Sequence, residues 1–350
     1  MLKSLKITNF KSINEEQLSF KPLTILTGKN STGKSSVIQS LLLVARNCNI
    51  ANEYIMQRLV SRYSDFETIR NKYENAKTVE ISIAIDNKKM GFSTTRECKI
   101  SNLESNNEFL RYEANSSYKS ELFYLNANRD GQEDIAQMSG MKVGETGEFL
   151  FGTFENLKSS ILPDYLCNFD NASDLSYQVN MWLSEIISIE TKLKTEKITD
   201  VNVRVMFDTD GLIEIAPSNL GAGVSYVAKI IILCLLAKKD DVVIIENPEI
   251  HLHPKSQAQL GVFFSFIANA GIQLIIETHC EHLINKIRYQ VYNDKIQASD
   301  ITILYKNAIR EPFKIISINS NGKYTNTNDE VISFPKGFFD SSVNDLMSIR

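Results

Sequence analysis

The residues best suited to chemistry form one glycine-rich run, Gly28-Lys29-Asn30-Ser31-Thr32-Gly33-Lys34-Ser35-Ser36. It fits the pattern GxxxxGK followed by Ser or Thr. The run comes directly after a short apolar stretch, Leu23 to Thr27, and opens a segment, Lys34 to Arg46, with helical apolar spacing. Backbone N–H groups in such a loop and at a helix N-terminus bind phosphate. The sequence therefore predicts a nucleotide site in which Lys34 reaches the terminal phosphates and Ser35 holds Mg2+.

A second group of polar residues follows another apolar run, Val242 to Ile245. Glu246 ends this run, and Asn247, Pro248 and Glu249 come next. An ATPase with a phosphate loop needs a carboxylate at the end of a neighbouring strand to hold Mg2+, and Glu246 has this position. Glu249 is a candidate general base, although a carboxylate there could equally cap the following turn.

A histidine follows the next apolar run along the chain, Ile272 to Ile276. It is His279, and Glu277 and Thr278 precede it. A histidine just past a strand of the same sheet can hydrogen-bond the γ-phosphate or orient the attacking water. We therefore expect His279 at the nucleotide site, with a packed or solvent-facing histidine as the alternative.

A third motif lies between these two halves of the site. Gly221 and Gly223 permit close backbone approach, and Ser225 is in the first turn of a predicted helix, where its hydroxyl could meet a phosphate. The same residues also fit the start of an ordinary helix. The position of the motif, shortly before the strand that ends in Glu246, favours a role in nucleotide binding.

The histidines and cysteines do not favour a zinc site. The four histidines are His251, His253, His279 and His282, and the five cysteines are Cys48, Cys98, Cys167, Cys234 and Cys280. The cysteines are odd in number, widely spaced and free of any CxxC pair, so a reducing cytoplasm is favoured over an export route with disulfides. The N-terminus alternates apolar and polar residues, so no signal sequence is expected there. A membrane span is not expected.

The elements that must position these residues alternate between strands and helices in the second half of the chain. The predicted strands there are Val201 to Phe207, Leu212 to Ile215, Val242 to Ile245 and Ile272 to Ile276. The predicted helices are Gly223 to Lys238, Pro254 to Asn269 and Cys280 to Val291. This alternation predicts an α/β fold with a mostly parallel sheet covered by helices.

The rest of the chain predicts additions to this sheet. Leu2 to Phe10, Thr78 to Ile85 and short strands between Phe92 and Phe123 favour an antiparallel β subdomain. Residues from about 50 to 76 and Leu175 to Ile189 favour helices. We expect a head over residues 1–300, with a core of residues 1–48 and 200–300 and insertions over about 50–199. Ile301 to Tyr305 and Phe313 to Ile318 then belong to a small strand-rich C-terminal domain, residues 301–350.

Composition excludes several classes of protein. The 350 residues are 43% hydrophobic and 23% charged, so disordered and fibrous chains are excluded. The formal charge of -4 argues against a surface coated in positive charge for nucleic acid, although a local basic patch is compatible with it.

These motifs, in this order, resemble the ABC-type ATPase heads of the RecF, SMC and OLD families. LKSLKITNFKSI is similar to their first strand, GKNSTGKSS to Walker A, SNLGAGVS to a divergent signature motif, IIENPEIHLHP to Walker B and the dimer loop, and IETH to the switch histidine. More narrowly, YLNANRDG, GETGEF, IETHCEHLINKIR and FPKGFFD resemble a group of bacterial AAA-type ATPases with a short C-terminal domain of unknown function.

The resemblance implies ATP and Mg2+ as cofactors and hydrolysis of ATP to ADP and phosphate. It also implies a homodimer or higher oligomer in which two heads enclose two ATP molecules, each between one chain's Walker A motif and the partner chain's signature loop. Relatives include ATPase subunits of phage-defence operons such as Septu and some retrons, whose partner is an HNH-type nuclease. A cytoplasmic ATPase that controls a protein effector in antiviral defence is the resulting expectation.

The chain also departs from those heads. They place a catalytic glutamate directly after the metal-side acid, where this chain has Asn247, so a slow nucleotide sensor is an alternative. A DNA-repair ATPase acting directly on DNA is another. The separation between Lys34 and Gly221 is too short for an SMC-length coiled coil. The Q-loop is expected near Asn128 to Gln132.

Overall fold

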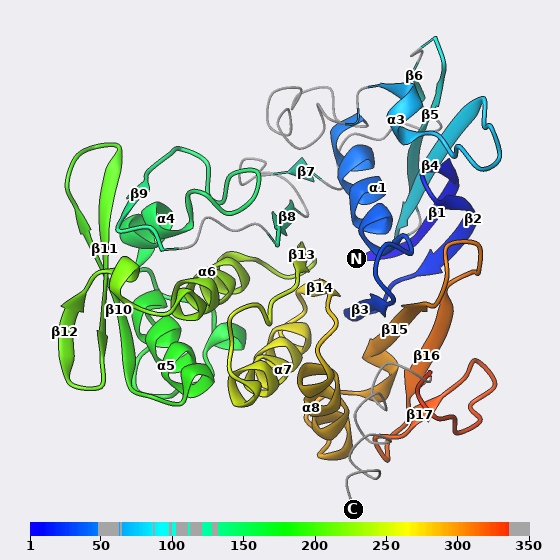
Figure 1. Ribbon diagram of the computed structural model, residues 1–350. Coiled ribbons are helices and arrows are strands. Elements are labelled where there is room, and N and C mark those ends of the chain that lie inside the picture. Colours follow the sequence, from blue (N-terminus) through cyan, green and yellow to red (C-terminus); the bar gives the residue numbers. More distant parts are fainter. Residues whose placement is uncertain are drawn as a thin grey trace, which may run out of the picture.

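The structure of the protein is a computed structural model, which describes residues 1–47, 63, 65–86, 88–97, 100–102, 111–112, 121–127 and 132–335. An eight-stranded mixed sheet forms its centre (Figure 1). In spatial order its strands are β17 (Tyr324–Thr325), β16 (Lys314–Ile318), β15 (Ile301–Lys306), β3 (Leu23–Gly28), β14 (Gln273–Glu277), β13 (Val242–Glu246), β8 (Glu121–Leu125) and β7 (Arg111–Tyr112).

The strands from β15 to β7 pair in parallel, and β16 and β17 add to the edge in antiparallel pairs. The inner strands are short apolar runs that are buried almost throughout, as expected for parallel strands covered on both faces. This confirms the predicted α/β class. Gly28, Glu246 and Glu277 are the last residues of β3, β13 and β14. Because these strands are parallel, their carboxyl ends lie at the same edge of the sheet.

Helices cover one face of this sheet. They are α4 (Leu150–Leu157), α5 (Leu175–Ile187), α6 (Ala222–Leu236), α7 (Pro254–Asn269) and α8 (Glu281–Tyr292). Leu23, Ile25, Val243 and Ile245 point from the sheet into a core that these helices complete. Their alternating neighbours on the same strands point to the opposite face, where a second core begins.

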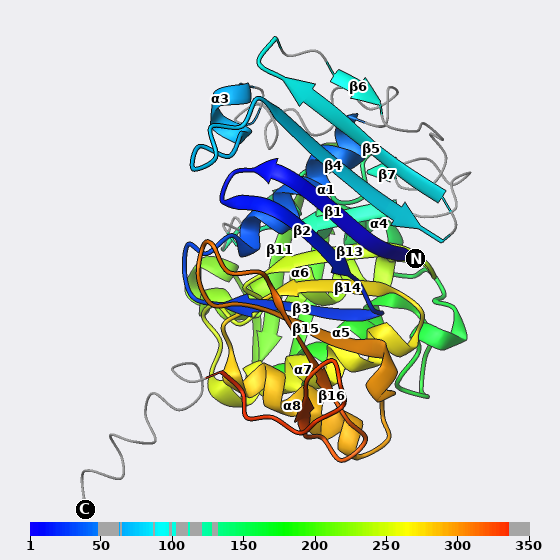
Figure 2. The same cartoon turned by 90° about the vertical axis from the view of Figure 1, so that its right-hand side faces the viewer.

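Helix α1 (Lys34–Asn47) and an antiparallel sheet cover that opposite face. The sheet has the order β2 (Ile13–Ser19), β1 (Leu2–Phe10), β4 (Thr78–Ile85), β5 (Lys88–Thr95) and β6 (Ile100–Asn102). Figure 1 shows α1 between this sheet and the strands β7 and β8 of the central sheet, and Figure 2 shows it behind β1 and β4. Buried side chains such as Val37 and Leu41 of α1 join Ile7 and Ile81 of the antiparallel sheet in the second core. The predicted antiparallel subdomain is thus present.

A third unit carries the remaining strands, β9 (Ile135–Gln137), β10 (Thr191–Lys197), β11 (Asn202–Thr209) and β12 (Leu212–Ile215), which pair antiparallel. It packs against α4 and α5, and Trp182 of α5 lies edge-on to Phe169 and Phe263. Short 3-10 turns complete this half of the chain at Asp164–Leu166, Pro217–Asn219 and Ala298–Asp300. The loop of residues 217–221 follows β12 directly and begins α6.

Two predicted elements differ from the structure. The stretch Phe92 to Phe123 was expected in an antiparallel meander, but β8 within it pairs in parallel with β13 in the central sheet. Its residues are buried throughout, which is the pattern of an inner parallel strand. In the predicted helix of residues 50–76, residues 50–62 and 64 lie outside the described part, and the described remainder holds only the short helix α3 (Phe66–Ile69).

The expected boundary at residue 300 runs through the central sheet. β15 pairs in parallel with β3 along its whole length, so residues 301–306 are part of the sheet that carries the phosphate loop. The end of the FPKGFFD segment lies outside the described residues, and Phe334 packs against Tyr305 and Tyr324. None of the described helices is both long and apolar enough to cross a membrane.

Candidate functional site

The glycine-rich run forms a tight loop between β3 and α1. Gly28 and Gly33 have φ angles of 134° and 115°, which L residues with a side chain rarely adopt. A Cβ at Gly28 would lie 2.1 Å from the carbonyl oxygen of Lys306, so only glycine fits there. The same carbonyl accepts a hydrogen bond from the N–H of Lys29 at 3.0 Å and one from the Thr32 hydroxyl at 3.4 Å. The last residue of β15 therefore holds the loop in place.

The loop opens into a cavity of about 580 Å3, a volume typical of small-molecule sites. Six residues of the predicted phosphate loop line it: Asn30, Ser31, Gly33, Lys34, Ser35 and Ser36. Asn247, Glu277 and His279 line it from the sheet side. Three motifs that are far apart in sequence therefore meet at one cavity, because each follows the carboxyl end of a parallel strand. Gly28, Lys29 and Thr32 shape the loop without lining the cavity.

The first turn of α1 brings the two chemical groups of the loop to the cavity. The Ser35 hydroxyl donates a hydrogen bond to Glu277 Oε1 at 3.1 Å. Lys34 is 3% exposed, and its ammonium donates to the Lys29 carbonyl at 2.6 Å. Burial lowers the pKa of Lys34, and the nearby carboxylate of Glu277 opposes this shift. The ammonium is thus held among backbone and carboxylate oxygens at the floor of the loop.

Glu246 and Glu277 end neighbouring strands in direct register, but they face different groups. Glu246 Oε2 accepts the N–H of Ala127 at 3.3 Å, and Glu246 also accepts a hydrogen bond from the Tyr124 hydroxyl. Burial and the nearby Glu246 raise the pKa of Tyr124 well above its usual value, so the phenol stays protonated and donates. Glu246 therefore orders the end of β8 and the residues after it.

Glu249 and His279 meet across the loops that follow β13 and β14. The backbone N–H of His279 donates to Glu249 Oε1 at 3.0 Å, and Glu249 Oε2 is buried without a hydrogen-bond partner. Asn247, which lies between Glu246 and Glu249 in the sequence, has a φ of 44°. Its N–H donates to the Glu277 carbonyl at 2.7 Å. Asparagine tolerates this left-handed backbone better than most residues. The turn aims Asn247 and His279 at the cavity and leaves Glu249 behind them.

Burial and nearby charges shift the pKa values of Glu277 and His279. Burial and, next, the carboxylate of Glu246 raise the pKa of Glu277 to about 7, while Lys34 and the Ser35 hydroxyl act in the opposite direction. Burial and the Lys34 ammonium lower the pKa of His279, which favours the neutral imidazole. A neutral imidazole can accept or donate a hydrogen bond at a phosphate or a water.

The residues present fit a magnesium ion bound together with a nucleotide. Mg2+ prefers oxygen ligands and is commonly held by one or two carboxylates, a hydroxyl, phosphate oxygens and water. Ser35 and Glu277 supply such oxygens at the cavity, and Glu277 Oε2 is buried without a hydrogen-bond partner. In the described part of the chain, no three His, Cys, Asp or Glu side chains come together as an all-protein metal site.

The loop with Gly221, Gly223 and Ser225 lies away from this cavity, since none of the three residues lines it. Ser225 is fully buried, and Gly223 packs against the His251 carbonyl, where a Cβ would come within 2.6 Å. The Ser225 hydroxyl therefore cannot reach a phosphate at the surface in this conformation, contrary to its predicted role. Gly221 is exposed and, with Ser218 and Asn219 before it, forms the accessible part of the loop.

Residues after β8 hold this loop from behind. Gln132 donates to the Leu220 carbonyl, and the Asp134 carboxylate accepts both the N–H and the hydroxyl of Ser218 at 2.8 Å. Between them, Glu133 forms a salt bridge of 3.1 Å with Lys229, which is 1% exposed in α6. Of the segment expected to hold the Q-loop, residues 128–131 lie outside the described part, and Gln132 contacts the loop of residues 217–221.

Several residues that line the cavity had no role assigned from the sequence. Lys11 and Ser12 line the cavity from the turn between β1 and β2, and Gln39 lines it from the second turn of α1. Lys11 has a φ of 51°, and its ammonium donates to Gln39 at 2.5 Å. No sequence signal marks this pair. Glu277 could have been found, because it ends an apolar strand in the same way as Glu246.

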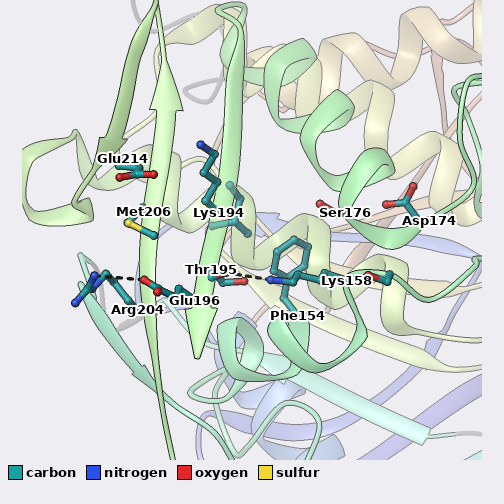
Figure 3. Close-up of a pocket in the computed structure, with 12 residues that line it drawn as sticks. Phe154, Lys158, Asp174, Ser176, Lys194, Thr195, Glu196, Arg204, Met206 and Glu214 are labelled. Carbon is teal, nitrogen blue, oxygen red and sulfur yellow. Dashed lines mark hydrogen bonds and ion pairs between the residues drawn. The ribbon is translucent and has the colours of Figure 1, made fainter. Parts of the chain in front are cut away.

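A larger cavity of about 930 Å3 lies in the third unit, between α4, the start of α5 and strands β10 and β11 (Figure 3). Its cations are paired with acids: Arg204 with Glu196 at 3.3 Å, Lys194 with Asp208 at 2.8 Å, and Lys158 with Glu155 at 2.8 Å. The charges of these cations are therefore balanced within the protein, and none of the three is a buried group available to bind a ligand. The phosphate loop is therefore the better candidate site.

Comparisons with known proteins agree with this geometry. A family model described as "AAA ATPase domain" matches residues 1–181, and one described as "AAA domain, putative AbiEii toxin, Type IV TA system" matches residues 111–285. No curated protein sequence matches the chain.

Two solved structures are similar in fold. One is an SMC head bound to the C-terminal winged-helix domain of ScpA, at 12% identity and a TM-score of 0.56, covering 91% of this chain and 97% of that one. The other is an SMC head with an extended coiled coil bound to the C-terminal domain of ScpA from Pyrococcus furiosus, at 10% identity and a TM-score of 0.54, covering 100% of this chain and 99% of that one. With a phosphate loop on an SMC-head-like fold and a family match over more than half of its length, the chain belongs to the AAA ATPase domain family.

Proposed function

We propose that this protein binds ATP with Mg2+ at the cavity between β3, α1 and β14, and hydrolyses it to ADP and phosphate. One observation carries the proposal: the Ser35 hydroxyl, the Lys34 ammonium and the Glu277 carboxylate converge on a cavity that His279 also lines. Lysine and backbone N–H groups would bind the phosphates, and a bound Mg2+ would neutralise the charge that develops on them. His279 would hydrogen-bond the γ-phosphate or the attacking water.

The general base in this proposal is Glu249. Asn247 cannot accept a proton at neutral pH, and Glu246 is engaged by Ala127 and Tyr124. Glu249 holds the backbone of His279 through one oxygen, and its second oxygen has no hydrogen-bond partner. In this proposal a reorientation of the His279 loop brings that oxygen to the attacking water, from which it takes a proton.

We further propose that two heads associate around ATP. The exposed residues Ser218, Asn219 and Gly221 lie away from the cavity of their own chain. A nucleotide phosphate that these residues contact therefore has to be bound at the site of a second chain. The start of α6 behind them offers backbone N–H groups. In this arrangement each nucleotide lies between the phosphate loop of one protomer and the loop of residues 217–221 of the other.

The dimer would control a separate effector. ATP hydrolysis is the chemistry proposed for this chain itself. One matching family is described as a putative toxin of a type IV toxin–antitoxin system. A nuclease in anti-phage defence is the partner that the sequence resemblance favours.

Asn247 favours a second candidate function, a nucleotide sensor that stays loaded with ATP. In this version the same site binds ATP and Mg2+, but the position after Glu246 lacks a base, and turnover is slow. Phosphate release by the wild type separates the two functions. Repeated turnover, with a steady-state rate of phosphate release that rises with ATP concentration, supports the ATPase. Tight ATP binding with only a single slow turnover supports the sensor. Addition of duplex DNA tests whether DNA is a direct ligand.

The decisive experiment uses Lys34→Ala. We expect the variant to lose most ATP affinity by calorimetry and all ATP-dependent dimerisation by light scattering, because the ammonium is the main cation at the phosphates, while its circular dichroism stays unchanged. Lys72→Ala is the matched control, since that side chain is exposed and does not line the cavity. Wild-type ATP affinity in Lys34→Ala would contradict the assignment of the site.

A further inference from the structure

Two carboxylates compete for the role of the acid beside Ser35. Glu246 and Glu277 are paired residues at the ends of β13 and β14. β14 lies between β13 and β3, so Glu277 is on the strand adjacent to the phosphate loop and Glu246 is one strand further away. Neighbouring strands are about 4.8 Å apart. This spacing alone favours Glu277 for a contact with the first turn of α1.

Hydrogen bonds separate the two acids more sharply. Glu277 Oε1 accepts the Ser35 hydroxyl at 3.1 Å, Glu277 lines the cavity, and its second oxygen is buried without a partner. Glu246 does not line the cavity and instead accepts the N–H of Ala127 and the hydroxyl of Tyr124. The carboxylate with an unused buried oxygen at the cavity is therefore Glu277.

Charge supports the same assignment. Glu277 is 5% exposed and close to Glu246 and Glu249, with Lys34 as the nearby cation. Buried acids so close together are costly unless a cation or a proton compensates them. A divalent ion between Ser35 and Glu277 would supply that compensation and would use the oxygen that has no hydrogen bond.

We propose that Glu277 is the protein carboxylate that holds Mg2+ beside Ser35, and that Glu246 is a positioning residue that orders Tyr124 and Ala127 at the end of β8. The assignment rests on the proposed function, because it names a residue of the same nucleotide site. It replaces Glu246, the expected metal-side acid, with a residue that is 242 positions from Ser35 in the chain. It also gives the two in-register acids separate tasks.

The test compares Glu277→Gln with Glu246→Gln, each nearly isosteric with the wild type. Mn2+ serves as the probe, and its binding in the presence of a non-hydrolysable ATP analogue is measured by electron paramagnetic resonance. We expect Glu277→Gln to weaken Mn2+ binding about ten- to a hundredfold, and Glu246→Gln to change it less than about threefold. Analogue binding without metal should persist in both variants, because Lys34 and the loop are intact.

Glu277→Asp provides a second variant if Glu277→Gln folds poorly, and it should retain part of the Mn2+ affinity because the carboxylate is kept. Unchanged Mn2+ binding in Glu277→Gln, or a larger loss in Glu246→Gln, would overturn the assignment while leaving the ATP site itself in place. A wild type that binds neither the analogue nor Mn2+ with the analogue would instead refute the proposed function, so the two failures have different signatures.

Discussion

At the scale of single residues, Asn247 separates two acids that point in different directions. Glu246 faces the end of β8, whereas Glu249 faces the backbone of His279. The positive φ of Asn247 creates this turn, because it reverses the chain directly after the strand. The split acid pair that was evident in the sequence therefore has a geometric consequence: the residue next to Glu246 is not the one placed to act as a base.

Glu249→Gln tests the role of that second acid. The amide retains an oxygen that can accept the N–H of His279, so the loop should keep its place, but it cannot accept a proton. We expect turnover to fall about a hundredfold to ten-thousandfold with ATP affinity unchanged, the usual effect of removing a general base. Phosphate release and calorimetry measure the two quantities.

Glu281→Gln is the control for Glu249→Gln, since Glu281 is an exposed acid at the start of α8 close to the same loop. It should hydrolyse ATP at the wild-type rate. If Glu249→Gln also does so, Glu249 only positions His279, and the base must be sought elsewhere or the protein is a slow sensor.

At the scale of elements, the loop of residues 217–221 depends on residues that are distant in sequence. Its 3-10 turn has no cap from its own segment, and the Asp134 carboxylate supplies one by accepting two hydrogen bonds from Ser218. Asp134 is also tied to β11, because its carbonyl accepts the N–H of Val205 at 3.0 Å. The accessible face of the loop is thus fixed by the third unit and not by the cavity.

Asp134→Ala should therefore weaken ATP-dependent dimerisation without changing ATP affinity of the single chain. Loss of a carboxylate cap costs about 1 kcal/mol, which corresponds to roughly fivefold in the association constant. Asp208→Ala is a matched control, because Asp208 likewise accepts a backbone N–H, that of Glu214 at 2.8 Å, but in the β11–β12 hairpin. Light scattering across a protein concentration series measures the effect. Equal dimerisation by both variants would argue against a role for the Asp134 cap.

At the scale of the whole molecule, buried polar side chains connect the antiparallel sheet that contains β1 and β2 to the central sheet at two places. Gln273 of β14 accepts the N–H of Leu2 and donates to its carbonyl, both at 2.8 Å. At the second place, Lys306 of β15 forms a 2.8 Å salt bridge with Glu16 of β2, and both residues are at most 9% exposed. The antiparallel sheet is therefore held to the strands on either side of the phosphate loop strand.

Another buried group makes global stability depend on pH. Asp241 accepts backbone N–H groups from Glu121 at 2.8 Å and Lys238 at 2.7 Å, and it is 2% exposed. Burial raises the pKa of Asp241 to about 6, above its usual value of 3.8, and the two backbone hydrogen bonds only partly oppose this. The folded chain therefore binds this proton more tightly than the unfolded chain. The contribution of Asp241 is full below about pH 4 and is lost as pH rises to about 6.

Asp241→Asn removes this titration. From pH 4 to pH 7 the wild type should lose roughly 3 kcal/mol more unfolding free energy than the variant, as the shift in pKa implies. Urea unfolding at a series of pH values measures the difference. Asp294→Asn is the control, because the Asp294 side chain is exposed, and it should follow the wild-type profile. Parallel profiles for the wild type and Asp241→Asn would contradict this prediction.

The sequence by itself determined the features that depend on neighbouring residues. The phosphate loop was predictable because its glycines, lysine and hydroxyl are contiguous and their spacing alone dictates the turn between β3 and α1. The alternation of apolar strands with helices was predictable for the same reason, and the comparison with SMC heads confirms the α/β class that it predicted.

Tertiary structure decided everything that depends on the order of strands and on which way a side chain turns. An apolar run such as Glu121 to Leu125 pairs equally well in either direction, and only its position beside β13 makes it parallel. The contact of Ser35 with Glu277, and the burial of Ser225, follow from where β14 and α6 lie relative to α1 and the loop after β13. Local patterns carry no information on such contacts, because β3 and β14 are adjacent in the sheet but separated by most of the chain.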